Sequence, residues 1–476
     1  MSGRLPEAET RFRDGIACAK AGSDAEAAEA FRKAAALRPG WAEAHNNLGA
    51  MLGRLGRTDD AIASFERATD LRPAFAIPYA NLGLCLARLR RFADAADAFR
   101  RGAALDPGLF EARVNLAVAL SLLGRHREAA DACREAARIA PGNANVRVRL
   151  GAALGRLGDF REAALAFRDA LDIDPACREA LRGLGWACAA GGRLEEAAEA
   201  FRREAAEAPE EALPRYNLGT VLGKAGKFEE AASRLREAAS LAPRHPETLY
   251  NLGVCLFRTR RHRPAAAAFR DAVRTRPAYA RARYNLGVAL HECGRKEDAA
   301  AAFRETLRNR PDHVRALYNL GVTCAALGRL RDAVASVREA VRIDPGHAAS
   351  RIALGNLLYR QGHYEEAAEA FREAIRIRPK DARGHNGLGA ALVRLSRPAE
   401  GKMAFRTAIL LFPAGAEANF NLGLCLLLER DREGASRQLA VLSSLKARLA
   451  ERYAALLRDR LGISPGRPGG GPRYGP

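Results

Sequence analysis

Apolar residues recur along this chain at two spacings, a short one typical of helices and a long one of 34 residues. The segment 280–313 shows the pattern. Its first half carries the apolar positions Leu286, Val288, Ala289, Leu290 and Cys293. Its second half carries Ala299, Ala302, Phe303, Thr306 and Leu307. Residues three or four apart lie on one face of a helix, so the pattern predicts two helices that each bury one face.

Other residues mark where these two helices begin and end. Gly294 follows the first apolar run and suits the left-handed conformation that often ends a helix. Glu297 and Asp298 come next, and acidic side chains are favourable at a helix N-terminus. Pro311 follows the second run and cannot continue a helix. The segment is therefore predicted to form a helical hairpin.

Small residues are expected to let the two helices of the hairpin approach closely. Gly287 and Ala299 are the small residues, and Phe303 is expected to fill the space beside them. A single hairpin of this kind leaves an apolar face uncovered, so it must stack on a neighbour.

The same unit recurs from Ala8 to Leu449, which makes 13 units of 34 residues without an insertion or deletion. Its first-helix glycine recurs with Ala117 as the one exception, at Gly15, Gly49, Gly83, Gly151, Gly185, Gly219, Gly253, Gly287, Gly321, Gly355, Gly389 and Gly423. The second-helix alanine is replaced once, by Gly401. Self-similarity at one fixed period indicates stacked repeats. The prediction is an all-α chain with a single α-solenoid of about 13 helix-turn-helix repeats over 8–449.

The two ends are predicted to differ from the repeats. Residues 1–7 are short and polar and are expected to be disordered, with no secretory signal. No closing proline interrupts the last unit, so one long capping helix is expected over 434–461, overlapping that unit. The segment 462–476 is rich in proline and glycine and is expected to be disordered. No uncharged apolar run is long enough for a membrane span.

The Leu-Gly pair, the turn glycine, the alanine, the phenylalanine and the closing proline at these offsets resemble the tetratricopeptide repeat. The resemblance covers about nine-tenths of the chain. It implies a right-handed superhelix whose first helices line a concave groove, and a role in protein–protein interaction. Repeats with Asn-Leu-Gly are also similar to the targeting arm of O-linked N-acetylglucosamine transferases. Only 27 residues follow Leu449, so the catalytic region of those enzymes is not expected here.

No pattern of catalytic or metal-binding residues stands out. The histidines are scattered, the glycine-rich segments belong to the repeat, and no pair of cysteines has the CxxC spacing. The sequence therefore predicts a protein that is not an enzyme and needs no cofactor or metal. Nine cysteines, mostly at apolar positions, are expected to be reduced thiols, which favours the cytoplasm.

The formal net charge is +21, which could indicate a nucleic-acid partner. Nearly all of the basic residues are arginines, and many lie beside acids on the predicted outer face of the second helices, where they favour a solvated and partly balanced surface. We therefore expect protein partners rather than nucleic acid. An RNA- or polyanion-binding module, and a targeting subunit of a separate enzyme such as a glycosyltransferase, remain the alternatives.

The resemblance places the candidate binding residues on the first helices of units spanning 212–415. Asparagine amides can hydrogen-bond both groups of a peptide backbone, tyrosines add contact area, and arginines pair with carboxylates. An asparagine or tyrosine at these positions could instead serve packing alone. The hypothesis is a groove for an extended, acidic peptide, formed by Tyr216, Asn217, Tyr250, Asn251, Arg258, Arg281, Tyr284, Asn285, Arg315, Tyr318, Asn319, Arg360 and Arg394.

Overall fold

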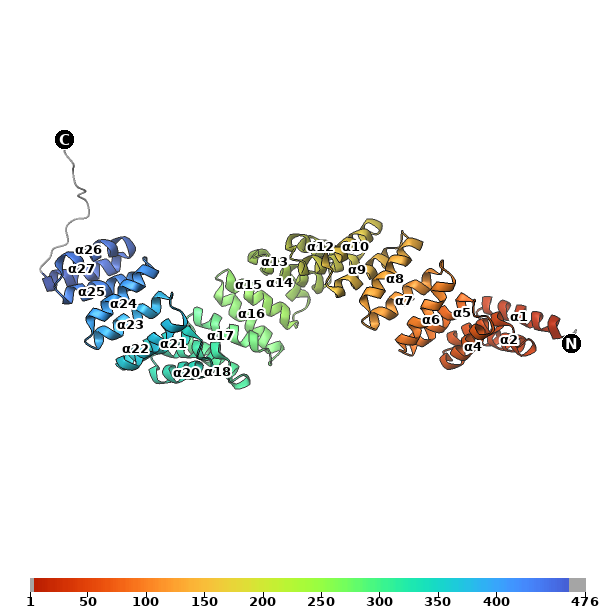
Figure 1. Ribbon diagram of the computed structural model, residues 1–476, viewed down its shortest axis with the longest axis horizontal. Coiled ribbons are helices and arrows are strands. Elements are labelled where there is room, and N and C mark those ends of the chain that lie inside the picture. Colours follow the sequence, from red (N-terminus) through yellow and green to blue (C-terminus); the bar gives the residue numbers. More distant parts are fainter. Residues whose placement is uncertain (1–3, 462–476) are drawn as a thin grey trace, which may run out of the picture. The chain divides into compact units, whose positions relative to one another are not determined.

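The computed structural model describes residues 4–461, and every regular element in that range is an α-helix (Figure 1). The chain divides into two compact units, residues 1–242 and 243–476. The first unit contains Arg4–Lys20 (α1), Asp24–Leu37 (α2), Ala42–Arg54 (α3), Thr58–Leu71 (α4), Ala76–Arg88 (α5), Phe92–Leu105 (α6), Phe110–Leu122 (α7), His126–Ile139 (α8), Ala144–Leu157 (α9), Phe160–Ile173 (α10), Arg178–Ala190 (α11), Leu194–Glu207 (α12), Ala212–Lys224 (α13) and Phe228–Leu241 (α14).

The second unit contains Pro246–Arg258 (α15), His262–Thr275 (α16), Ala280–Glu292 (α17), Lys296–Asn309 (α18), Val314–Ala326 (α19), Leu330–Ile343 (α20), Ala348–Gln361 (α21), Tyr364–Ile377 (α22), Ala382–Arg394 (α23), Pro398–Leu411 (α24), Ala416–Leu428 (α25), Arg432–Leu445 (α26) and Ala447–Leu461 (α27). From α1 to α26, odd-numbered helices are the first helices of the predicted hairpins and even-numbered helices are the second. Within each unit, each hairpin packs on the next (Figure 1). The all-α fold of about 13 hairpins is confirmed, whereas the single solenoid over 8–449 stays a prediction.

The close approach of the two helices in most hairpins depends on a glycine facing an aromatic ring. A Cβ placed on Gly287 would lie 2.7 Å from Cε1 of Phe303, and one on Gly253 would lie 2.6 Å from Cε1 of Phe269. Both rings are buried. The predicted packing of Phe303 beside Gly287 is therefore confirmed, and any side chain at the glycine would displace the ring.

The one hairpin without this glycine is also one that lacks the ring. Ala117 stands in place of the glycine on α7, and Cys133 stands in place of the phenylalanine on α8. Both are buried, at 2% exposure each. A smaller partner on the second helix thus leaves room for the extra methyl group on the first.

The turn between the two helices of a hairpin uses a left-handed residue in every repeat. Nine repeats place glycine there, as at Gly294 with φ of 77°. The other four place a residue with a side chain, namely Arg90, Arg260, Ser396 and Arg430, at φ between 59° and 62°. Residues with a Cβ rarely adopt this conformation, so these four turns carry local strain.

The two ends differ from the prediction. Helix α1 begins at Arg4, so residues 4–7 are helical. The predicted single capping helix over 434–461 is wrong, because Lys446 adopts an extended conformation with φ of −158° and separates α26 from α27. The predicted disordered tail 462–476 lies outside the described residues.

Helix α27 covers the last hairpin by inserting a tyrosine. Tyr453 is fully buried, and its hydroxyl donates a hydrogen bond of 2.9 Å to the carbonyl oxygen of Gly423. A Cβ on Gly423 would lie 2.6 Å from the Tyr453 ring. The ring therefore takes the place that a phenylalanine of the second helix takes in most other hairpins.

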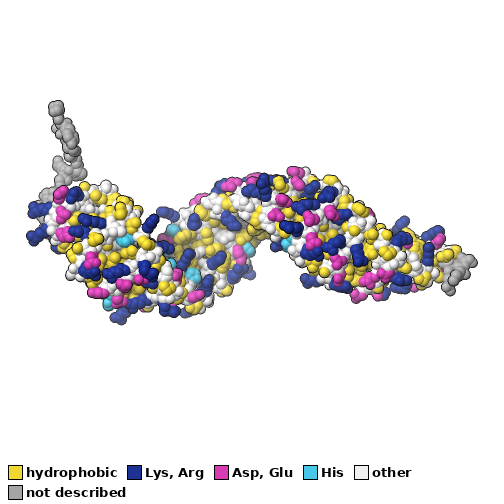
Figure 2. Space-filling model, in the orientation of Figure 1, with side chains coloured by type: hydrophobic (Ala, Val, Ile, Leu, Met, Phe, Trp, Pro, Cys, Tyr) yellow, Lys and Arg dark blue, Asp and Glu magenta, His cyan; other side chains and the backbone are white. Residues whose placement is uncertain are grey.

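Charged side chains of both signs are interspersed over the visible face of the molecule (Figure 2). Many pairs lie one turn apart on a second helix, such as Arg100 and Asp97 at 2.6 Å. Others join second helices of consecutive repeats, such as Arg338 and Glu366 at 2.7 Å. Much of the positive charge is thus compensated locally. Among residues 4–461, no helix is long and apolar enough to cross a membrane.

Candidate functional site

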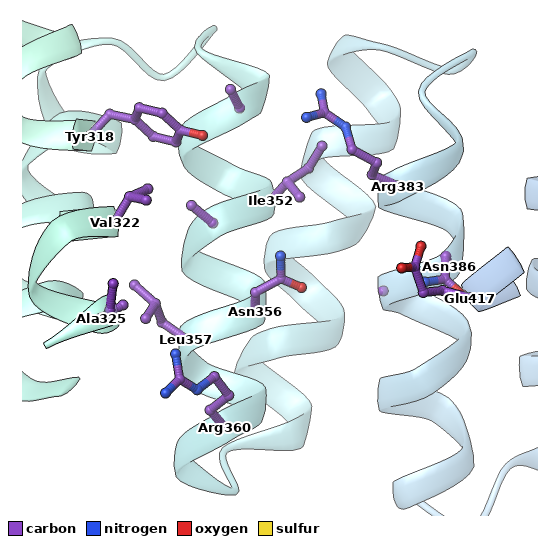
Figure 3. Close-up of a pocket in the computed structure, with 14 residues that line it drawn as sticks. Tyr318, Val322, Ala325, Ile352, Asn356, Leu357, Arg360, Arg383, Asn386 and Glu417 are labelled. Carbon is purple, nitrogen blue, oxygen red and sulfur yellow. The ribbon is translucent and has the colours of Figure 1, made fainter. Parts of the chain in front are cut away.

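The first helices of the second unit line three neighbouring pockets. The largest of them, about 530 Å³, lies over α19, α21 and α23, and Glu417 of α25 reaches it. Its walls are apolar at Val322, Ile352 and Leu357. Figure 3 shows Arg383 toward one end of this pocket and Arg360 toward the other, with Asn356 between them. The surface therefore combines an apolar floor with two guanidinium groups.

A second pocket of about 440 Å³ lies over α15, α17 and the start of α19. It is polar, and its lining residues are Tyr250, Arg281, Tyr284, Asn285, Arg310, Asp312, His313, Val314 and Arg315. Burial, and then the charges of Arg310 and Arg315, lower the pKa of His313. Its ring stacks on that of Tyr284, with the centroids 5.0 Å apart.

A third pocket of about 220 Å³ is mainly apolar and adjoins the second, since Asn285 lines both. Val254, Phe257, Phe269 and Val288 form its apolar wall, and Arg258 lies at its edge. Together the three pockets offer apolar, amide and guanidinium groups along consecutive first helices, which is the chemistry that an extended peptide requires.

Of the sequence-predicted residues, Tyr250, Arg281, Tyr284, Asn285 and Arg315 come together in the second pocket. Tyr318 and Arg360 line the first pocket, and Arg258 lines the third. The binding role of these residues stays a prediction.

Other predicted residues lie elsewhere. Arg394 stands over the ring of Tyr364, 4.7 Å from its centroid, and lines none of the three pockets. Asn217 differs from the expectation, because its side chain is only 1% exposed and cannot contact a ligand in a groove. Tyr216 is half-buried on α13, in the first unit.

The asparagines of consecutive first helices are hydrogen-bonded to the preceding repeat. Nδ2 of Asn285 donates to the hydroxyl of Tyr250 at 3.2 Å, and Nδ2 of Asn319 donates to that of Tyr284 at 2.8 Å. The same geometry joins Asn421 to the side-chain oxygen of Asn386 at 3.0 Å. One amide proton of each such asparagine is thus used between repeats, which leaves the second proton and the oxygen for a ligand.

The arginines differ in how their charge is compensated. Arg383 is paired with Asp381 at 2.7 Å. For Arg281, Arg315 and Arg360, the described residues provide no carboxylate within 4.0 Å, although most ion pairs of the chain involve arginine. Guanidinium groups without an internal partner are the ones that can neutralise an acidic ligand.

The prediction missed Ile352, Asn356 and Asn386 of the first pocket, although they occupy first-helix positions expected to face the groove. Ile352 is not one of the residue types that the prediction selected, and Asn356 and Asn386 lie at other first-helix positions than the selected asparagines. It also missed Arg310, which lies after the second helix of its hairpin. A comparison of the ion pairs of other repeats would have been needed to find it.

The described part of the chain offers no cluster of side chains that could hold a metal ion. Burial raises the pKa of Cys133, Cys255 and Cys425 to about 11 each. These thiols are therefore protonated at neutral pH, whereas a nucleophilic cysteine needs its thiolate form.

Family models for the tetratricopeptide repeat match most of the chain. One model matches residues 47–110, 110–144, 148–212, 258–307, 294–348 and 391–440, and two others match 355–396 and 210–278. No curated protein matches the sequence.

Several solved structures are similar to the chain. YrrB, described as a TPR protein with an unusual peptide-binding site, is 24% identical over 39% of this chain and 96% of its own, with a TM-score of 0.36. Yeast Tom70 is 16% identical over 89% of this chain and 97% of its own, with a TM-score of 0.39. A chain of the APC/C hetero-tetramer Cut9–Hcn1 is 13% identical over 95% of this chain and 96% of its own, with a TM-score of 0.43.

Proposed function

We infer that this chain, which belongs to the tetratricopeptide repeat family, is a non-catalytic scaffold that binds an extended, acidic segment of another protein along its first helices. The observation that supports this proposal is the row of three pockets on α15 to α25, which combine apolar walls with Arg281, Arg315 and Arg360, three arginines that have no carboxylate within 4.0 Å among the described residues. Apolar side chains of the segment would occupy the walls, and its carboxylates would pair with the guanidinium groups.

The pocket over α19, α21 and α23 shows how one stretch of such a segment would be held. Val322 and Ile352 would contact an apolar side chain, and Arg360 would pair with a carboxylate next to it. Asn356 is exposed and could hydrogen-bond the backbone of the segment. The nine free cysteines are compatible with a reducing compartment such as the cytoplasm for this interaction.

The test compares two peptide libraries of equal length, in which apolar residues alternate with glutamate in one and with lysine in the other. We expect the full chain to bind the glutamate library in a fluorescence anisotropy titration. Arg360→Glu should weaken this binding about tenfold, because it replaces a favourable charge pair with a repulsive one. Arg406→Glu, the same change at an exposed position on the second helix α24, is the control.

The proposal fails if neither library binds, or if Arg360→Glu and Arg406→Glu have equal effects. A single-stranded RNA in the same titration tests the alternative suggested by the net charge of +21. Binding of RNA in preference to both libraries, with a steep loss of affinity as salt rises, would favour that alternative. Changing Asn251, Asn285 and Asn319 together to alanine tests the amide contacts, and unchanged affinity would remove them from the site.

A further inference from the structure

The pocket over α15, α17 and the start of α19 holds an uncompensated cluster of arginines. Arg281, Arg310 and Arg315 all line it. Asp312 is the one carboxylate among its lining residues, so cations exceed anions. The described residues place no carboxylate within 4.0 Å of any of the three guanidinium groups, and the cluster has no internal counter-ion in contact with it.

In two other repeats, an ion pair joins the positions that correspond to Arg281 and Arg310. In the repeat 42–75, Glu43 near the start of the first helix pairs with Arg72 after the second helix at 2.7 Å. In the repeat 246–279, Glu247 and Arg276 make the same pair at 2.6 Å. The fold therefore brings these two repeat positions within contact distance of each other.

In the repeat 280–313, the two positions are Arg281 and Arg310. Arg281 thus stands where a glutamate would pair with Arg310, and it adds a second cation instead. Arg315, on the next first helix, adds a third guanidinium group to the same pocket. Like charges in one pocket repel one another, and an anion bound among them would relieve that repulsion.

The number of positive charges in this pocket indicates which kind of anion it would bind. A single carboxylate can be paired by one guanidinium group, as Glu43 is paired by Arg72. A phosphoryl group carries up to two negative charges and three acceptor oxygens, and it can use several guanidinium groups at once. The hydroxyl of Tyr284 and the amide of Asn285 line the same pocket and add neutral donors.

The apolar surface next to this pocket indicates which kind of molecule would carry the phosphoryl group. The adjoining pocket presents Val254, Phe257 and Val288, and the pocket over α19 and α21 presents Val322 and Ile352. A nucleic acid would need a track of cations that follows its regularly spaced phosphates. One cationic pocket with apolar pockets near it instead fits a single phosphorylated side chain flanked by apolar residues.

We propose that Arg281, Arg310 and Arg315 form a binding site for a phosphorylated serine or threonine side chain of an extended protein segment. This inference rests on the proposed function, because the segment is the one that the first helices would hold. Phosphorylation of a partner would then raise its affinity for this chain, so the site would make the scaffold sensitive to a kinase.

The decisive variant is Arg281→Glu, because it places an acidic side chain where Glu43 and Glu247 lie in other repeats. It would pair with Arg310, as Glu247 pairs with Arg276, and would fill the site from within while preserving the fold. Arg310→Gln removes a cation without adding an anion. Arg304→Glu, an exposed position on α18 that does not line the pocket, is the matched control.

The probes are three peptide libraries with the same apolar and glutamate-containing flanks and a central phosphoserine, serine or glutamate. We expect the phosphoserine library to bind the full chain about tenfold more tightly than the serine library, as charge-assisted hydrogen bonds are gained. Arg281→Glu should abolish this preference, Arg310→Gln should reduce it, and Arg304→Glu should retain it. Thermal melting of Arg281→Glu should show that the chain remains folded.

The outcomes separate the two proposals. Equal binding of the phosphoserine and serine libraries, or a preference that survives Arg281→Glu, would overturn the phosphate site while the peptide-binding function stands. Binding of no library would overturn both. Inorganic phosphate is tested in the same titration: if it displaces the phosphoserine library and the serine library equally, the phosphoryl group is not what the site recognises. Stronger binding of single-stranded RNA, lost in Arg281→Glu, would also contradict the proposal.

Discussion

The hydroxyl of Tyr284 accepts a hydrogen bond of 2.8 Å from Nδ2 of Asn319, which lies on the first helix of the following repeat. The bond joins two hairpins through side chains that the sequence also suggests for ligand binding. Tyr250 and Asn285 repeat this relationship one unit earlier. These residues therefore hold adjacent first helices together whether or not a ligand is present.

Tyr284→Phe should destabilise the second unit by about 1 kcal/mol, because the amide of Asn319 loses its acceptor in a half-buried position. Tyr318→Phe is the matched control, since the next repeat has Ala353 where the asparagine would lie. Urea unfolding of both variants checks the prediction. Equal losses in the two variants would show that the hydrogen bond does not contribute.

Gly287→Ala should destabilise its hairpin by about 2 kcal/mol, because the new methyl group would lie 2.7 Å from the ring of Phe303. Phe303→Cys should cost about 3 kcal/mol through the cavity that it leaves. The double variant should cost less than the sum of the two, since Ala117 and Cys133 coexist in the hairpin of α7 and α8. A double-mutant cycle measures this coupling, and additive effects would contradict it.

Arg182 and Glu204 form an ion pair at 2.6 Å in which the carboxylate is fully buried. Arg182→Ala should cost about 3 kcal/mol, because Glu204 would remain buried without its partner. Combining Arg182→Tyr with Glu204→Ala should recover the wild-type stability to within about 1 kcal/mol. The buried side-chain amide of Asn217, which has no hydrogen-bond partner among the described residues, would gain a hydroxyl acceptor like that of Tyr284. Calorimetric melting compares the variants, and a double variant as unstable as Arg182→Ala would refute the argument.

The same ion pair predicts a dependence on pH. Burial raises the pKa of Glu204 against the opposing effect of Arg182. A carboxyl group with a raised pKa in the folded state stabilises that state fully below its unfolded pKa of about 4.3, and loses this contribution as pH rises through the folded value. The wild type should therefore gain stability relative to the Arg182→Tyr, Glu204→Ala variant as pH falls through the raised pKa of Glu204 toward the unfolded value. Urea unfolding at several pH values measures this change.

Arg260→Gly should stabilise the turn between α15 and α16 by about 0.5 kcal/mol, because it removes a side chain from a left-handed conformation. Gly294→Arg, in the equivalent turn of the next repeat, should have the opposite sign. Hydrogen exchange of the amides in the flanking helices measures both changes locally. A loss of protection in Arg260→Gly would show that the arginine contributes contacts that outweigh the strain.

The repeat itself was predictable from the sequence because its causes are local. Gly287, Phe303 and Pro311 each act within one hairpin. Their spacing alone therefore indicates where the helices lie, which side chains pack between them and where the second helix ends. The break at Lys446 was not predictable in this way, because Leu442 and Leu449 continue a helical spacing across it. Only the packing of Tyr453 on Gly423, in the preceding repeat, requires the chain to turn there.

The candidate site was predictable to a smaller extent, for a similar reason. Tyr250, Arg281 and Tyr284 occupy first-helix positions whose direction follows from the repeat, and they come together in one pocket. Whether an arginine is free depends on side chains from other segments, as the contrast between Arg276 and Arg310 shows. The burial of Asn217 likewise depends on its surroundings and not on its repeat position.

Tyr453 also limits how this architecture can grow. The tyrosine occupies the place beside Gly423 that a phenylalanine of the hairpin's own second helix takes in most other hairpins, and it comes from α27, which follows the last hairpin. A copy of the repeat added by gene duplication after α26 would therefore have to displace α27 before it could dock. Helix α27 thus covers the surface of the last hairpin on which a further hairpin would stack.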